Sequence, residues 1–146
     1  DLRKPALHKR FKISNTVGLS EVLIGNQKTS EAAQMHNDNL VVLTSGKVPP
    51  NPSEMLASKA MTNLIENLKD NFDYVILDSA PVQVVTDSQI LSTKADGTML
   101  VVKAQKTKRD SVKNAIGLLK SVNANILGTV LNGVEKSKYD IKSYTL

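Results

Sequence analysis

The sequence predicts an α/β domain in which a parallel sheet is flanked by helices. Two observations predict this class. Short apolar runs that resemble buried strands alternate four times with segments of helical periodicity, and such alternation favours strand–helix–strand units in one sheet. The chain has 146 residues, 40% of them hydrophobic and 23% charged, which suits one globular domain with a single core.

The first third of the chain predicts one short helix and one short strand. Residues 1–17 are basic and irregular. Residues 18–25 have apolar residues at helical spacing, and Gly25 is suited to the left-handed position that ends a helix. Residues 40–43 form a β-rich run closed by small polar residues, which indicates a strand.

The central part predicts a long helix followed by a buried strand. Asn51 can cap the helix, Pro52 suits its first turn, and Glu54 stands where a capping-box carboxylate belongs. We expect this helix to continue to about residue 69. Residues 72–77 are almost uninterruptedly apolar, as in a strand that is covered on both faces.

The last part continues the alternation. Residues 86–89 match a capping box that opens a helix, with Thr86 and Asp87 as capping residues. Residues 98–103 form the next predicted strand, and Thr107 or Asp110 would cap the helix after it. Residues 126–131 are the final apolar strand. The predicted α/β domain therefore spans residues 1–132, and residues 133–146 form a flexible C-terminal tail.

Asp78 directly follows the predicted buried strand at residues 72–77. Ligands of open α/β sheets collect at the carboxyl ends of the strands. A carboxylate there can hold Mg²⁺ directly or through water, as in a Walker B motif, although a strand-ending aspartate is also a common turn residue.

Composition narrows the binding partners. The formal net charge is +5 and the pI about 9.4, which suits a phosphate-bearing or other anionic partner. Aromatic residues make up only 3%, so there are few surfaces on which bases can stack. We therefore expect no nucleic-acid partner.

Several segments appear in the order typical of one family. They are 51–54 (Asn-Pro-Ser-Glu), 78–81 (Asp-Ser-Ala-Pro), 85–87 (Val-Thr-Asp), 126–132 (Ile-Leu-Gly-Thr-Val-Leu-Asn) and the opening Asp-Leu-Arg-Lys-Pro. This series resembles the bacterial tyrosine kinases of capsular and exopolysaccharide synthesis, whose domain is Rossmann-like and of the P-loop NTPase type. The opening residues resemble the end of the family's second acidic motif, Walker A′.

The resemblance implies roles for four residues in a site for ATP and Mg²⁺. Asp78 and Asp1 would be catalytic residues and metal ligands. Arg3 would contact phosphate or an acidic group, or would be a solvated surface charge. Asn132 resembles the asparagine that contacts the adenine ring in related ATPases, and is equally well placed for an ordinary turn.

The resemblance also implies phosphate acceptors and a missing part of the site. Tyr139 and Tyr144 would be the phospho-acceptors, although the family's tail usually carries a denser tyrosine cluster. No Gly-x-x-x-x-Gly-Lys-[Ser/Thr] loop occurs in the sequence. We therefore expect a chain truncated at its N-terminus, with an incomplete sheet, that is inactive by itself.

In the family, activation comes from the cytoplasmic segment of a membrane-spanning polysaccharide co-polymerase or adaptor. The resemblance thus implies a cytoplasmic kinase recruited to the inner face of the cell membrane. It also implies self-association into a ring, in which one subunit's tail enters the site of its neighbour.

Two other functions remain open at this point. One is a deviant-Walker ATPase of the partition or placement type, which switches on dimerisation without phosphorylating tyrosine. The other is a non-catalytic interaction module that kept the fold. Phosphotyrosine would favour the kinase, ATP binding without phosphotyrosine would favour the ATPase, and absence of nucleotide binding would favour the module.

Overall fold

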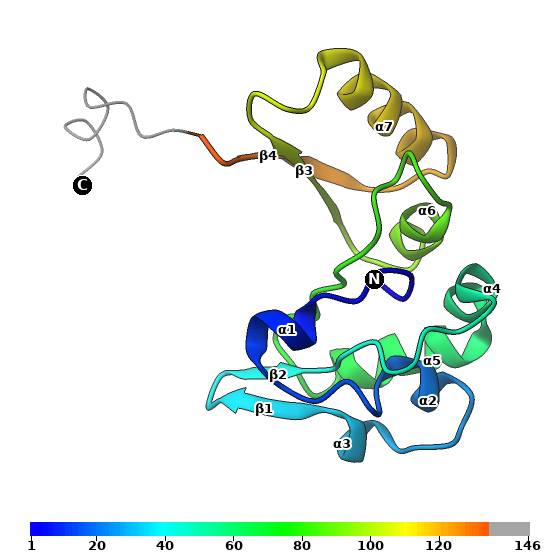
Figure 1. The fold of residues 1–146 in the computed structure, drawn as a ribbon. Coiled ribbons are helices and arrows are strands. Elements are labelled where there is room, and N and C mark those ends of the chain that lie inside the picture. The colour runs from blue at the N-terminus through cyan, green and yellow to red at the C-terminus, as the bar shows by residue number, and fades with distance from the viewer. Residues whose placement is uncertain (135–146) are drawn as a thin grey trace.

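The computed structural model describes residues 1–134. Its elements form two groups, with α6 in contact with helices of both (Figure 1). The first group holds helices α1 to α5 and a small hairpin. The second holds strands β3 and β4 with helix α7. The predicted tail, apart from its first two residues, lies outside the described residues.

The first group begins with short elements. They are α1 (Leu7–Phe11), α2 (Leu19–Leu23), α3 (Thr29–Ala32), β1 (Gln34–Asn37) and β2 (Leu40–Val42). The predicted helix after Gly18 and the predicted strand at residue 40 are confirmed. Gly25 has a φ of 78°, the left-handed conformation expected after a helix. Strand β2 pairs with β1 in an antiparallel hairpin, and neither β1 nor α1 was predicted.

The helix expected over residues 51–69 is wrong as one unit, because it is broken into α4 (Pro52–Ala57) and α5 (Lys59–Lys69). Ser58 lies between them with extended dihedrals, φ −63° and ψ 159°. Its hydroxyl accepts a hydrogen bond from the amide of Met61 and donates one to the carbonyl of Met55. Asn51 does not cap α4, since its side chain donates to the carboxylate of Glu54 instead.

Residues 72–77 do not form the predicted strand. They have no regular secondary structure, and no described strand hydrogen-bonds to them. Tyr74 is 86% and Ile76 is 90% exposed. A strand needs a partner for its backbone groups, and the described residues provide none. The apolar pattern alone therefore predicted a pairing that this part of the chain cannot make.

The second group confirms the parallel α/β unit. After α6 (Asp87–Ser92), strand β3 (Thr98–Lys103) pairs in parallel with β4 (Ile126–Asn132), and α7 (Arg109–Ser121) connects them. Parallel strands require such a crossover. Neither Thr107 nor Asp110 caps α7 through its side chain.

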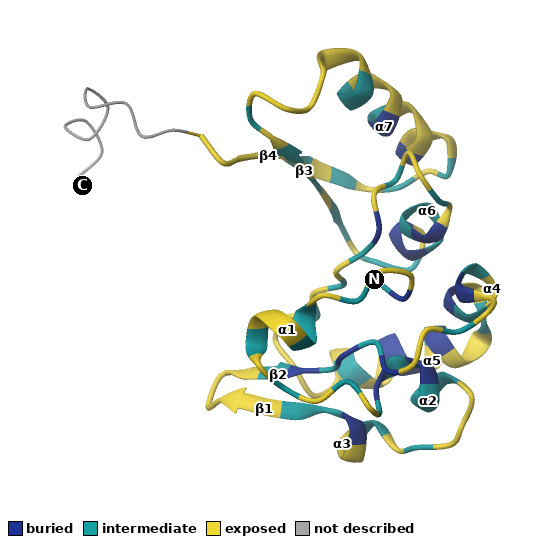
Figure 2. Cartoon of the chain, viewed as in Figure 1, coloured by how far each residue is buried: buried dark blue, intermediate teal, exposed yellow. Residues whose placement is uncertain are grey.

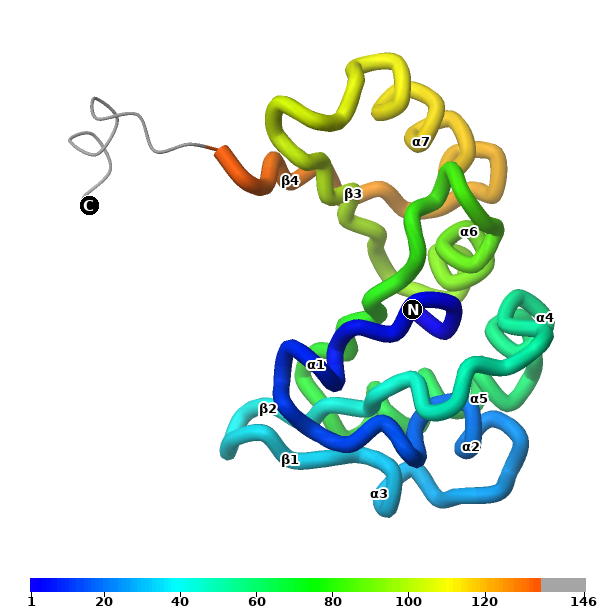
Figure 3. Tube along the Cα trace, viewed as in Figure 1, coloured from blue at the N-terminus to red at the C-terminus, as the bar shows by residue number. Residues whose placement is uncertain are grey.

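The apolar core lies in the first group and reaches α6 (Figure 2). Its buried side chains are Leu2, Leu56, Met61, Leu64, Ile65 and Leu91. Leu2 is only 2% exposed, so the start of the chain is anchored in this core and lies between the two groups (Figure 3). None of the helices over residues 1–134 is long and apolar enough to cross a membrane.

Candidate functional site

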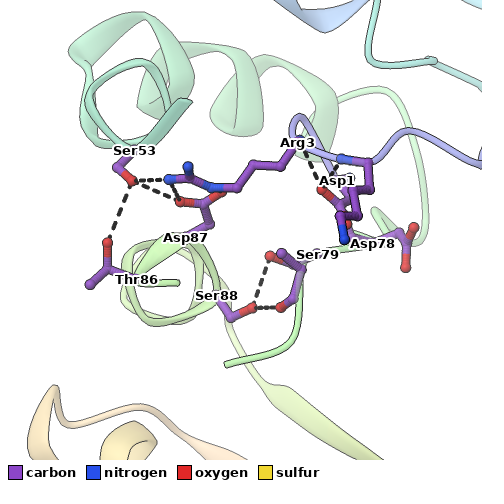
Figure 4. A network of polar contacts seen from close by, with 10 residues as sticks. Asp1, Arg3, Ser53, Asp78, Ser79, Thr86, Asp87 and Ser88 are labelled. Carbon is purple, nitrogen blue, oxygen red and sulfur yellow. Dashed lines mark hydrogen bonds and ion pairs between the residues drawn. The ribbon is translucent and has the colours of Figure 1, made fainter. Parts of the chain in front are cut away.

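Asp1 and Asp78 are 77 residues apart in the sequence and adjacent in the structure. The main-chain nitrogen of Asp1 donates a hydrogen bond of 2.8 Å to the carbonyl oxygen of Asp78. Figure 4 shows the two residues side by side. The fold thus brings the backbones of the two predicted residues together, and Asp1 is half-buried while Asp78 is exposed.

The Asp1 carboxylate is oriented by its own loop. Its Oδ1 accepts hydrogen bonds of 2.9 Å from the amides of both Arg3 and Lys4. Leu2, between them, is buried in the core. One carboxylate oxygen therefore fixes the turn, and the other has no hydrogen bond within residues 1–134.

Arg3 reaches from this loop to the first turn of α6 (Figure 4). Its Nε donates to Oδ2 of Asp87 at 2.9 Å, and its Nη2 donates to Oδ1 at 2.9 Å. Ser53, at the start of α4, accepts from Arg3 at 2.8 Å and donates to Asp87 at 2.8 Å. Such a bidentate pair is both strong and geometrically specific. Arg3 is therefore no freely solvated surface charge.

Asp87 is 1% exposed and is ionised in this arrangement. The hydrogen bond from Arg3 lowers the pKa of Asp87 below its ordinary value, and the hydrogen bond from Ser53 acts in the same direction. Burial alone would raise it. The predicted capping role of Thr86 and Asp87 is wrong for their side chains, which make no capping hydrogen bond, because the Asp87 oxygens are occupied by Arg3 and Ser53.

The next residue of α6 holds the loop that follows Asp78. The hydroxyl of Ser88 donates a 3.0 Å hydrogen bond to the hydroxyl of Ser79, and it also contacts the carbonyl of Ala80. Consecutive residues of α6 thus contact the loops of both Asp1 and Asp78. Asp87 contacts the Asp1 loop through Arg3, and Ser88 contacts the Asp78 loop through Ser79.

Asp1 and Asp78, here called the acidic pair, suit a magnesium–nucleotide complex better than a site in which protein side chains alone surround the metal. Residues 1–134 contain no group of three or more potential metal-ligating side chains. Mg²⁺ in phosphate-transfer sites is held by one or two carboxylates, with phosphates and water completing its shell. The Asp78 carboxylate and the second oxygen of Asp1 have no hydrogen-bond partner in this part of the chain, so the residues present fit that role.

The remaining predicted residues are not part of these contacts or lie outside the described residues. Asn132 ends β4, where its carbonyl accepts from the amide of Ala104 at 2.8 Å. Its side chain is exposed, and contact with adenine stays a prediction, as does contact between Arg3 and phosphate. Tyr139 and Tyr144 lie outside the described residues.

Sequence reasoning missed the contacts that organise the site. Ser53 and Asp87 stood in segments that match helix-start patterns, and such patterns give no sign that two helix starts bind one arginine. The sequence analysis left an acidic group open as a partner of Arg3, and the structure identifies this group as Asp87.

The fold is α/β with a parallel pair of strands, and its structural neighbours are domains of the P-loop NTPase-like class. No family model matches the chain. It is 41% identical to the tyrosine-protein kinase YwqD of Bacillus subtilis over 145 residues, which are 99% of this chain and 61% of that protein. The chain thus spans about three fifths of the length of this curated relative.

Two solved structures agree with this similarity. The kinase domain of the Escherichia coli tyrosine kinase ETK has a TM-score of 0.90 and 34% identity, and covers all of this chain and 58% of that one. The VpsO kinase domain has a TM-score of 0.85 and 32% identity, over 92% of this chain and 68% of that one. The chain therefore belongs to the family of bacterial tyrosine kinases of capsule and exopolysaccharide synthesis.

Proposed function

We propose that this chain is part of the catalytic domain of a tyrosine autokinase that transfers a phosphoryl group from ATP to tyrosines of its own tail. The observation that carries the proposal is the contact between Asp1 and Asp78, which joins the two acidic motifs across 77 residues. Phosphoryl transfer depends mainly on positioning and on neutralising charge. Two acidic residues whose backbones are in contact would supply the protein's half of that requirement.

Each residue has a defined part in this proposal. Asp78, which is exposed and follows residues 72–77, holds the metal. Asp1 contributes its free oxygen as a second ligand, or accepts a proton from the tyrosine hydroxyl. Asn132, at the end of β4, contacts the adenine. Bound Mg²⁺ would neutralise charge on the phosphates.

The acceptors and partners follow from family membership. Tyr139 and Tyr144 are the proposed phosphate acceptors, and each phosphate would add about −1.5 to −2 charges to a lysine-containing tail. The proposed activator is the cytoplasmic segment of a membrane-spanning polysaccharide co-polymerase or adaptor. It would recruit the kinase to the inner face of the cell membrane, where copies assemble into a ring.

We further propose that residues 1–146 alone are inactive. Strand β3 pairs only with β4 among the described residues, and it exposes Met99 by 61% and Val101 by 62%. The apolar segment at residues 72–77 is unpaired as well. An incomplete sheet is consistent with the absence of a phosphate-binding loop from the sequence.

The test is phosphotyrosine formation by the complete protein with ATP and Mg²⁺. Asp78→Asn should lower the rate at least about 100-fold, in the range lost when a group that stabilises developing charge is removed. Replacing Tyr139 and Tyr144 by Phe should remove most of the signal. Asp96→Asn is a matched control, because Asp96 is exposed and its side chain pairs only with Lys69 among residues 1–134.

Three outcomes separate the proposal from its alternatives. ATP binding without phosphotyrosine would indicate the deviant-Walker ATPase. No nucleotide binding by the complete protein would indicate the interaction module. Phosphotyrosine formed by residues 1–146 alone would contradict the proposed inactivity of this chain.

A further inference from the structure

The first turn of α6 contacts the loops of both acidic residues. Asp87 holds Arg3 by two hydrogen bonds of 2.9 Å, and Arg3 belongs to the turn that the Asp1 carboxylate closes. Ser88 holds Ser79, the residue that follows Asp78. Consecutive residues of one helix therefore contact both loops, which also contact each other through Asp1 and Asp78 (Figure 4).

We infer that Asp87 is a positioning residue, which acts through Arg3 to hold the turn of Asp1 against Asp78 in the orientation that binds the metal–nucleotide complex. The inference rests on the proposed function of that acidic pair. Asp87 itself is 1% exposed, so it is too deeply placed to bind a ligand directly. Its oxygens are already used by Arg3 and Ser53.

The geometry favours positioning over simple stabilisation. The core already anchors this segment through Leu2, which is 2% exposed. The backbone of Asp1 is held by Asp78, and neither that contact nor Leu2 joins the turn to α6 by a hydrogen bond. The bidentate guanidinium pair adds a fixed direction, because two parallel hydrogen bonds define the plane of both groups. What the pair adds is thus the orientation of the turn that presents Asp1.

The experiment titrates Mg²⁺ into the complete protein with a fluorescent ATP analogue. Asp87→Asn should raise the Mg²⁺ concentration for half-maximal binding by about tenfold or more, as loss of a residue that orients a metal ligand does. Saturating Mg²⁺ should restore nucleotide affinity to nearly the parent value. Ser53→Ala removes one hydrogen bond each from Arg3 and Asp87, and should give a smaller rise in the same direction.

The control is Leu91→Ala, in the same helix. Leu91 is buried at 7% exposure in the same core cluster as Leu2, so its loss weakens the core while the hydrogen bonds between Arg3 and Asp87 stay in place. We expect Leu91→Ala to lower the melting temperature and leave the Mg²⁺ requirement unchanged. If Asp87→Asn does not fold, Ser53→Ala serves as the test against the same control.

Three results would overturn the inference, and they are distinguishable. An unchanged Mg²⁺ requirement in Asp87→Asn and Ser53→Ala, while Asp78→Asn loses Mg²⁺-dependent binding, would reject positioning and leave the proposed function standing. An equal rise of the Mg²⁺ requirement in Leu91→Ala would also reject positioning, because Asp87 would then act only by stabilising the fold. A parent protein without Mg²⁺-dependent binding would overturn both proposals together.

Discussion

At the scale of single residues, the buried charge of Asp87 makes stability depend on pH. Its pKa is lowered from the ordinary value of 3.8, first by the hydrogen bond from Arg3. A carboxyl group whose pKa is lower in the folded state binds protons more readily in the unfolded state. It therefore stabilises the fold above pH 3.8, and this contribution is lost as the pH falls through the folded value.

We predict that Asp87→Asn lowers the free energy of unfolding at pH 7 and weakens its dependence on pH in the acid range. The difference in the free energy of unfolding between the parent and the variant should shrink as the pH falls below about 4, because protonation removes the same charge from the parent. Urea unfolding of the complete protein between pH 2 and pH 7 measures both quantities. A constant difference across that range would contradict the prediction.

How much of the site could be predicted depends on whether a residue's signal is local. Asp78 follows an apolar run, a position typical of the ligand edge of a sheet but also of an ordinary turn residue. Asp1 became a candidate only through resemblance, since its contact with Asp78 spans 77 residues. Asp87 gave a local signal that pointed elsewhere, because an aspartate at a helix start is usually a capping residue. Long-range pairing overrode that preference.

At the scale of elements, the break at Ser58 sets how α4 and α5 meet. Apolar spacing continues through residues 51–69, so the sequence predicted one helix, although a serine within such a run can also begin a new one. The Ser58 hydroxyl serves both helices, since it contacts Met55 of α4 and Met61 of α5. The start of α4 carries Ser53, so this junction also supports the Arg3–Asp87 pair.

We predict that Ser58→Ala lowers the free energy of unfolding by about 1 kcal/mol, the usual cost of removing a helix cap. Ser58→Thr keeps the hydroxyl and should lose less. Ser111→Ala is the control, because the Ser111 side chain makes no hydrogen bond within residues 1–134, and its change should stay within about 0.5 kcal/mol. Denaturant unfolding measures all three, and equal losses for Ser58→Ala and Ser111→Ala would refute the capping role.

At the scale of the whole molecule, the strands show which part of the fold local sequence specifies. Strands β3 and β4 were predicted correctly, because a helix of sufficient length joins them and lets them pair in parallel. The run at residues 72–77 has the same apolar character, yet it remains unpaired in the described residues. Periodicity predicts that a segment is suited to a strand, whereas only a neighbour with free backbone groups makes it one.

The exposed apolar side chains of that segment give the last prediction. Ile76 is 90% exposed and lies in an apolar run typical of strands that are covered on both faces. In the complete protein we expect it to be buried in a filled sheet. Ile76→Ala should then cost about 2–5 kcal/mol of unfolding free energy, as core substitutions of this kind do.

Two other isoleucines of the chain calibrate the measurement. Ile65 is buried at 5% exposure and should show the same loss on substitution by alanine, whereas Ile24, at 59% exposure, should lose much less. Denaturant unfolding of the three variants of the complete protein orders them directly. If Ile76→Ala costs no more than Ile24→Ala, the segment stays open to solvent in the complete protein. The sheet would then have a free apolar edge, which is available for pairing with another chain.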